Sequence, residues 1–209
     1  MSHYMHLEGM DLSGKTTTAA RYAEQSPLDW RVNHNSISEH NPIYELADKL
    51  RLEDAYDPEV VGNVYVAALM GDMRTFERPS GINVIQDSTI VLRSLAYHTV
   101  KKTPRLGSML QDIAAEHPRF DASFYLYADM DARRDRLAQR QAERPWEVAE
   151  DDLMILKDPK RFEDMEAMLQ HWSTTIFNST VIDTTEMTPM QVHNAIADKF
   201  NPGVNNDRI

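Results

Sequence analysis

The chain has no cysteine and no long apolar segment. Without cysteine it cannot form disulfides, thiolate nucleophiles, zinc–cysteine sites or iron–sulfur clusters. The longest apolar run, residues 64–70, is seven residues long, whereas a membrane-spanning helix needs about 20. The first residues lack a basic segment followed by an apolar block, which is the pattern of a secretion signal. These absences predict a cytoplasmic protein without a membrane partner.

Positive charge is also scarce, because 22 Lys and Arg face 33 Asp and Glu and give a formal net charge of −11. This balance repels phosphate backbones and disfavours duplex nucleic acid as a partner. A small anionic ligand remains compatible, since a few local arginines outweigh distant negative charge. The chain has 209 residues, of which 42% are hydrophobic. We therefore expect one domain over residues 1–201 and a flexible C-terminal tail at 202–209.

Strand-like and helix-like segments alternate along the chain. Short apolar segments predict strands at residues 4–9, 32–38, 82–86, 122–128 and 180–183. Helical patterns lie between and after them, at residues 14–25, 43–52, 57–78, 90–100, 105–117, 131–144, 151–156, 161–177 and 188–200. The alternation predicts an α/β fold in three layers, with a five-stranded parallel sheet flanked by helices. Ligands of such sheets bind at the carboxyl ends of the strands.

One motif falls at such a strand end. Residues 9–16 fit the pattern G-x-x-x-x-G-K-[ST] of a phosphate-binding loop (P-loop), between an apolar strand and a helix. Its glycines let successive backbone N–H groups point at phosphates, and the following helix offers its positive N-terminus. Lys15 is predicted to contact the β- and γ-phosphates of ATP and to act as a catalytic residue. The Thr16 hydroxyl is predicted to ligate Mg²⁺. The predicted ATP-phosphate residues here are Gly9, Met10, Asp11, Leu12, Ser13, Gly14, Lys15, Thr16 and Thr17. A glycine-rich turn with a coincidental Lys-Thr pair is the alternative.

Asp87 ends the third predicted strand. A carboxylate at this position can orient Mg²⁺ through water, or it can accept the proton of an acceptor hydroxyl. The alternative is an aspartate that only forms the turn and caps the next helix. We predict Asp87 as a catalytic, metal-orienting and substrate-binding residue.

An arginine-rich segment follows the fourth predicted strand. Arg133, Arg136, Arg140 and Arg144 step by three and four residues and so share one helix face. Phosphoryl transfer spreads negative charge that such a face can neutralise, which predicts a helical lid at about residues 133–158. Arg140 and Arg144 are the predicted catalytic residues, and Arg136 is a predicted ATP-phosphate ligand. A solvated, salt-bridged face is the alternative.

Several segments together resemble a known family. They are residues 6–17 (HLEGMDLSGKTT), residues 69–74 (LMGDMR), Asp87 with residues 94–98 (SLAYH), residues 124–140 and residues 181–183. Each is similar to the corresponding part of the thymidylate kinase family of P-loop nucleotide kinases. The resemblance implies ATP and Mg²⁺ as cofactors, thymidine monophosphate as the acceptor, and homodimers formed through helices. A helix from Asp57 with Gly62 and residues 67–68 would allow such close packing.

The same resemblance assigns acceptor residues. It implies that Asp11 helps to hold the acceptor sugar and the metal, and that Arg74 and Tyr97 contact the acceptor. Met70 stands where the family has an aromatic side chain that stacks on the base.

The acceptor side also departs from the family. Ser88 stands where the family has an arginine that holds the acceptor monophosphate, and the turn at residues 38–42 lacks the family's arginine and glycine. Arg93, one helical turn before Tyr97, is a candidate replacement, with a solvent-exposed side chain as the alternative. Glu39, in that turn, is a candidate acceptor contact.

These departures leave alternatives to thymidine monophosphate open. One is a kinase that phosphorylates a hydroxyl of a nucleoside or modified nucleobase, which brings no phosphate to hold. The other is a nucleotide-binding module that transfers nothing.

Overall fold

In the computed structural model, residues 2–38, 40–53 and 55–200 are described. Within them, one parallel sheet has the strand order β2-β3-β1-β4-β5. Its strands are β1 (Tyr4–Glu8), β2 (Trp30–His34), β3 (Asn83–Asp87), β4 (Ala122–Tyr127) and β5 (Thr180–Asp183). The predicted α/β fold with a five-stranded parallel sheet is confirmed.

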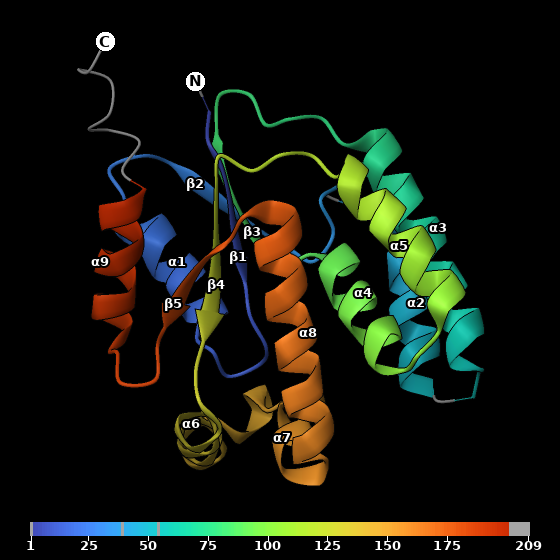
Figure 1. Cartoon of the computed structure of the whole chain (residues 1–209). Coiled ribbons are helices and arrows are strands. Elements are labelled where there is room, and N and C mark those ends of the chain that lie inside the picture. Colours follow the sequence, from blue (N-terminus) through green and yellow to red (C-terminus); the bar gives the residue numbers. More distant parts are fainter. Residues whose placement is uncertain (1, 39, 54, 201–209) are drawn as a thin grey trace.

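Helices cover both faces of the sheet (Figure 1). One face carries α1 (Lys15–Gln25) and α9 (Pro189–Lys199). On the other side lie α2 (Pro42–Glu53), α3 (Pro58–Thr75), α4 (Ile90–Val100), α5 (Pro104–Glu116) and α8 (Pro159–Phe177). Beyond the carboxyl end of β4 follow α6 (Met130–Glu143), two short 3₁₀ turns and α7 (Met154–Lys157). This end of the sheet is where the ligand site of the fold is expected.

The hydrophobic core is split by the sheet. Neighbouring residues of β4 point to opposite faces, so that Phe124 packs with Ala19 and Ile196 on the α1–α9 side. Tyr125 packs with Leu95 and the α4–α8 layer on the other side. Burying each large apolar side chain contributes about 1.5–3 kcal/mol, so the two layers hold the sheet from both faces.

Helix boundaries follow the predicted signals closely. Asp57 caps α3 by accepting a 2.7 Å hydrogen bond from the Glu59 N–H, and Thr188 forms a capping box with Gln191 at α9. Two predicted ends are wrong by three residues or more. Helix α3 ends at Thr75 rather than at residue 78, and β2 ends at His34 rather than at residue 38. The strand stops because Asn35 takes a left-handed conformation with φ of 59°.

Two of the three small residues of α3 that predicted a dimer contact, Gly62 and Ala68, face the chain's own interior. A Cβ atom at Gly62 would lie 2.6 Å from the His98 ring and 2.7 Å from Leu106 Cδ1. Ala68 is fully buried, whereas Ala67 is exposed. Gly62 and Ala68 therefore serve the close packing of α3 within this chain, and a homodimer stays a prediction.

Candidate active site at the carboxyl end of the sheet

The P-loop joins β1 to α1, with β3 and β4 on either side of β1. The order of strands along the chain reverses here, and this is where open α/β sheets bind ligands. Gly9 has a φ of 148°, and a Cβ atom there would lie 2.3 Å from the Leu126 carbonyl oxygen. Gly14, at the N-cap of α1, has a φ of 94°. Glycine is therefore required at both ends of the loop.

Lys15 and Thr16 begin α1 and point to the predicted partners. The Lys15 ammonium donates to the Met10 carbonyl oxygen at 3.3 Å, which folds the side chain over the loop. Burial lowers the pKa of Lys15, and the nearby Arg93 charge lowers it further, against the opposing Asp11, Asp87 and Glu8 carboxylates. The Thr16 hydroxyl donates to Asp87 Oδ2 at 2.9 Å. The structure thus brings the loop and the end of β3 together.

Asp87 is buried and has a second neighbour that the sequence analysis missed. His34, at the end of β2, places Nδ1 3.1 Å from Asp87 Oδ2. Burial would raise the pKa of Asp87, but the His34 hydrogen bond, the Lys15 charge and the Thr16 hydrogen bond outweigh it and lower the pKa. The other oxygen, Asp87 Oδ1, is buried and has no hydrogen-bond partner in the described part of the chain.

A magnesium ion fits this pair of oxygens. Mg²⁺ prefers oxygen ligands and is usually held by one or two protein groups together with water and substrate phosphates. The Thr16 hydroxyl and the Asp87 carboxylate supply such groups, and the unpartnered Oδ1 is an acceptor that a metal-bound water could use. Over the residues described, no group of three or more His, Asp or Glu side chains is placed to hold a metal on its own. The site therefore suits a metal that arrives with a phosphate ligand.

Arg93 of α4, the candidate replacement for the arginine that the family has at position 88, reaches the P-loop. Its Nη2 donates to the Gly9 carbonyl oxygen at 3.0 Å. Its Nε lies 3.7 Å from Glu8 Oε1, and its Nη1 lies 3.7 Å from Asp11 Oδ1. Burial would raise the pKa of Asp11, but Arg93, Lys15, Arg133 and Arg140 together lower it. The Arg93 charge is thus shared by two carboxylates.

Glu8 is a buried acid that the sequence analysis did not single out. It is fully buried at the end of β1 and accepts hydrogen bonds from the Gly9 and Thr89 N–H groups, both at 3.1 Å. Burial would raise the pKa of Glu8, but the His6 hydrogen bond and the Arg93 charge hold it below its ordinary value. Glu8 therefore ties the start of the P-loop to the turn before α4.

The arginines of α6 divide into two groups along the helix. Arg136 donates to the Leu12 carbonyl oxygen at 2.9 Å and to the Thr184 carbonyl oxygen at 2.6 Å, and Arg133 is fully buried beneath the loop. Arg140 pairs with Asp152 at 3.0 Å, and the exposed Arg144 pairs with Glu147 at 2.9 Å. The first two arginines hold the loop, and the last two pair with acids of the segment that follows α6.

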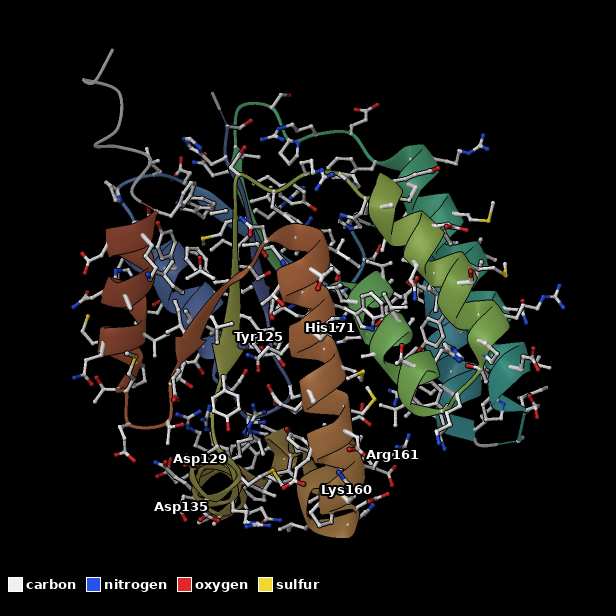
Figure 2. The ribbon with its side chains drawn as sticks, viewed as in Figure 1. Tyr125, Asp129, Asp135, Lys160, Arg161 and His171 are labelled. Carbon is white, nitrogen blue, oxygen red and sulfur yellow. The ribbon has the colours of Figure 1, made fainter. Side chains whose placement is uncertain are left out.

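Figure 2 shows that α6 and the start of α8 lie at the same end of the molecule. Asp129 and Asp135 mark α6, and Lys160 and Arg161 mark the first turn of α8. The Arg161 guanidinium lies over the Tyr97 ring, with 5.6 Å between its carbon and the ring centroid. Tyr97, a predicted acceptor residue, is therefore placed between α4 and α8.

Two of the remaining predicted acceptor residues, Met70 and Arg74, lie on α3. Met70 is 53% exposed, and Arg74, one turn later, is exposed on the same face. Neither side chain is brought to the P-loop by a contact in the described structure. The third, Glu39, falls outside the described residues.

Asp72, between Met70 and Arg74, instead organises the loop after β2. Its carboxylate accepts hydrogen bonds from the Ser36 hydroxyl at 2.8 Å, the Ser38 hydroxyl at 2.6 Å, the Asn41 amide at 2.6 Å and the Ile37 N–H at 3.1 Å. It is 2% exposed. An isolated acid in a helix that is otherwise largely apolar was the available signal, because such an acid must find buried partners.

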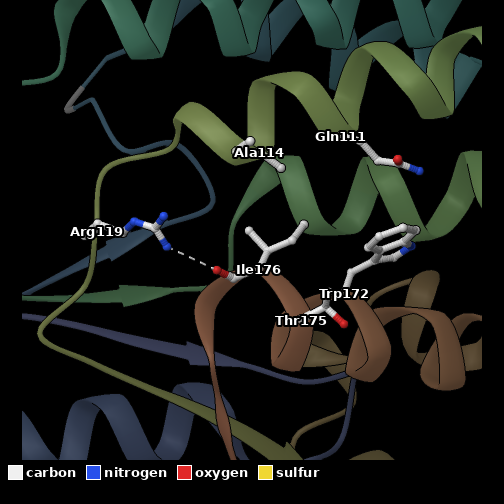
Figure 3. A pocket seen from close by; sticks show the side chains of 7 residues that line it. Gln111, Ala114, Arg119, Trp172, Thr175 and Ile176 are labelled. Carbon is white, nitrogen blue, oxygen red and sulfur yellow. Dashed lines mark hydrogen bonds between the residues drawn. The ribbon is translucent and has the colours of Figure 1, made fainter.

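Two surface hollows lie away from this site. One, of about 330 Å³, is formed between α5 and α8 (Figure 3). It is lined by Gln111, Ala114, Ala115, Arg119, Trp172, Thr175 and Ile176. The other lies along α2, around Tyr44 and Leu52. Neither is lined by a residue that the motifs predict, so the site is assigned by its chemistry rather than by its depth.

The chain matches no family model and no curated protein by sequence. Its structure is similar to the thymidylate kinase from Candida albicans, with a TM-score of 0.69 at 14% identity, over 95% of this chain and 90% of that one. It is also similar to the deoxyadenosine kinase from M. mycoides with bound dATP, with a TM-score of 0.58 at 14% identity, over 94% and 98% of the two chains. The chain therefore shares its fold with two kinases. No described helix is long and apolar enough to span a bilayer.

Proposed function

We propose that the protein transfers the γ-phosphoryl group of ATP, in the presence of Mg²⁺, to a nucleoside- or nucleotide-like acceptor. The observation that carries this proposal is the P-loop beside the Thr16–Asp87 pair, in which the hydroxyl and the carboxylate are 2.9 Å apart. Its similarity in fold to a thymidylate kinase and a deoxyadenosine kinase supports the proposal. So does its resemblance in sequence to the thymidylate kinase family.

The donor would be held by the P-loop. Backbone N–H groups of the loop and the N-terminus of α1 would bind the phosphates, and Lys15 would place its charge at the β- and γ-phosphates. The bound metal would supply charge neutralisation between these phosphates. Arg140 and Arg144, released from Asp152 and Glu147, would neutralise the charge that develops on the transferred group.

Thymidine monophosphate is the acceptor that the family resemblance implies. Arg93 lies 3.7 Å from Asp11 of the loop, and Tyr97 follows one turn later on α4. We assign these three side chains to the acceptor. Met70 and Arg74 would join them only if α3 moved toward the loop. A phosphate acceptor needs no general base, so Asp87 would then serve the metal alone.

A hydroxyl acceptor is the second candidate, and the charge around Arg93 favours it. Ser88 supplies no positive charge, and Arg93 is already paired with Glu8 and Asp11. A monophosphate would bring about two negative charges beside Arg93, whose charge these two carboxylates already share. A neutral hydroxyl avoids this cost. Its proton would pass to Asp87 as its oxygen bonds to the γ-phosphorus and the bond to the ADP oxygen breaks.

The experiment is a transfer assay with labelled ATP, Mg²⁺ and a panel of nucleosides and nucleoside monophosphates. Transfer to any member supports the proposed kinase. Labelled thymidine diphosphate would establish the monophosphate acceptor, and labelled nucleoside monophosphates would establish the hydroxyl acceptor. Saturable binding of Mg²⁺·ATP without transfer to any acceptor would instead support a non-catalytic nucleotide-binding module.

A further inference from the structure

Every carbonyl group of the P-loop from Gly9 to Ser13 accepts a hydrogen bond from a side chain. The donors are Arg93 to Gly9, Lys15 to Met10, Arg133 to Asp11, Arg136 to Leu12, and the Thr184 hydroxyl to Ser13. They come from α4, α1, α6 and the turn after β5. Fixing carbonyl groups on the outer side of a loop fixes the peptide planes, and so the inward direction of the N–H groups.

Arg133 is the most deeply placed of these donors. Its side chain is 1% exposed. Its Nη1 donates to the Asp11 carbonyl oxygen at 2.6 Å, and its Nε donates to the Ala128 carbonyl oxygen at 2.7 Å. Its Nη2 bonds to Glu166 of α8. Because each guanidinium nitrogen is already engaged and the group is buried, Arg133 is not placed to touch a phosphate.

Glu166 holds Arg133 from the other side. Glu166 lies on α8, and its Oε1 accepts a 2.5 Å hydrogen bond from the Tyr125 hydroxyl of β4. Figure 2 shows Tyr125 on β4, on the side that faces α8. The Arg133 guanidinium also lies 5.2 Å from the centroid of the Phe162 ring. Arg133 of α6 is thus held by α8 directly and by β4 through Glu166, and it contacts the middle of the P-loop.

We propose that Arg133 is a positioning residue that fixes the centre of the P-loop, with Glu166 and Tyr125 as its support. The inference deepens the proposed function and rests on it, since it assigns this buried group to the ATP site. The chain Tyr125–Glu166–Arg133–Asp11 carbonyl would keep the loop N–H groups aligned before ATP binds. Such prior alignment lowers the cost of binding and of reaching the transition state.

A purely structural role must be separated from this positioning role. Arg133→Met alone leaves the Glu166 carboxylate buried and unpaired, so it would destabilise the fold whatever the loop does. Burial raises the pKa of Glu166 and the Arg133 charge opposes that rise, so the carboxyl would take up a proton without Arg133. The triple variant Tyr125→Phe, Arg133→Met, Glu166→Met removes all three polar groups together. Replacing a buried ion pair by apolar side chains is often neutral for stability.

The experiment measures three quantities in the full-length chain: the melting temperature, the Kd for Mg²⁺·ATP by calorimetry, and amide hydrogen exchange over residues 9–14 without ligand. In the triple variant we expect a melting temperature near that of the wild type. The Kd should rise about tenfold, a loss typical of a displaced binding group, and the loop amides should exchange faster. Arg134→Met is the matched control, since Arg134 is a neighbour on α6 that is exposed and pairs with Asp131.

If the triple variant folds poorly, Arg133→Lys tests the same positioning role. Lysine keeps a positive charge beside Glu166, but one ammonium group cannot replace the planar fork that joins Ala128, Asp11 and Glu166. We expect a small change in melting temperature and weaker Mg²⁺·ATP binding. Wild-type affinity and wild-type exchange of residues 9–14 in either variant would overturn the positioning role. A wild-type chain that binds no Mg²⁺·ATP would overturn the proposed function, and the inference with it.

Discussion

The two sides of the candidate site are built differently. The phosphate-binding part of the donor side is one continuous stretch, residues 9–16, between β1 and α1. The acceptor side is assembled from the end of β2, α3, the turn after β3 and α4, where Asp72 accepts from the Ser36 hydroxyl and Arg93 pairs with Glu8 and Asp11. A continuous motif can be recognised in one sequence, whereas an assembled surface depends on contacts between distant segments. This difference explains why the sequence indicates the phosphate donor more clearly than the acceptor.

The two sides also differ in how firmly their arginines are already paired with carboxylates, and so in the positive charge that remains for a ligand. On the donor side, Arg144 forms an exposed pair with Glu147, from which it can be released because exposed ion pairs contribute little, whereas the partner of Arg140, Asp152, is buried. On the acceptor side, Arg93 is held by Glu8, which is fully buried, and by Asp11. Arg144 is thus the arginine most easily freed for an anionic donor, and the charge of Arg93 is already shared by carboxylates; variants of each side test this contrast.

The largest effect is expected for Lys15→Ala. The variant removes the one positive side-chain charge within the P-loop motif, so transfer should fall about 1,000-fold, the upper range for loss of one transition-state donor. The fold should persist, because the Lys15 ammonium bonds within the described structure only to the Met10 carbonyl group. The measurement is kcat with labelled ATP, together with the melting temperature. Lys160→Ala, on an exposed turn of α8, is the matched control. An unchanged rate in Lys15→Ala would contradict the donor assignment.

Asp87→Asn separates the two acceptor candidates. With a hydroxyl acceptor, loss of the base should lower kcat about 300-fold, within the range for general base catalysis. With a phosphate acceptor no base is needed, so the main change should be a higher Mg²⁺ requirement. Titrating Mg²⁺ at saturating ATP distinguishes these results. Recovery of full kcat at high Mg²⁺ would exclude the hydroxyl mechanism through Asp87.

Arg140→Ala should lower kcat about 100-fold, because it removes a charge from the transferred group. Arg144→Ala should have a smaller effect, since Arg144 lies further along the segment and is 54% exposed. The KM for ATP should change less than kcat in both variants, because the charge is needed chiefly in the transition state. The measurement is a full kcat and KM series, with Arg134→Ala as control. Equal rates in all three variants would remove the predicted lid.

The sequence predicted the fold and the glycine-bounded loop far better than the partners of the buried charged groups. Pro58 after a capping Asp57, Thr188 before Pro189, and the loop between Gly9 and Gly14 each act through local backbone physics. Helical spacing predicted that the arginines from 133 to 144 share a face, but it did not reveal that Arg133 is buried, because spacing defines a face and not its neighbours. The roles of Glu8 and Asp72 depend on partners far away in the sequence, so no local pattern contains them.

Asp72→Ala should affect the acceptor side and spare the donor side. It leaves the Ser36, Ser38 and Asn41 donors without their acceptor, which should cost about 3 kcal/mol of unfolding free energy. If the loop after β2 forms part of the acceptor site, the acceptor KM should rise about tenfold, as for other displaced positioning groups. The KM for ATP should stay near the wild-type value. Asp112→Ala, on an exposed face of α5, is the control. A rise in both KM values would show that the two sides are coupled.

The smallest effect on transfer is expected for His117→Phe. His117 is buried at the opposite end of the sheet, just before β4. Burial lowers the pKa of His117 from 6.5 to about 4, while its Nδ1 lies 3.0 Å from the Pro118 carbonyl oxygen. The unfolded chain binds the proton more readily than the folded chain. Stability is therefore complete above pH 6.5 and falls as the pH approaches 4, by about 3 kcal/mol for this group.

Denaturant unfolding of the wild type and of His117→Phe between pH 4.5 and 7.5 measures this contribution. The variant should show a flatter pH dependence of the unfolding free energy, because phenylalanine fits the aromatic neighbours Phe120 and Phe177 and does not titrate. His40→Gln, at an exposed histidine, should keep the wild-type slope. Transfer at pH 7.5 should be unchanged in both variants, since His117 touches neither side of the site. Loss of ATP affinity alone in His117→Phe would show that this end of the sheet communicates with the P-loop.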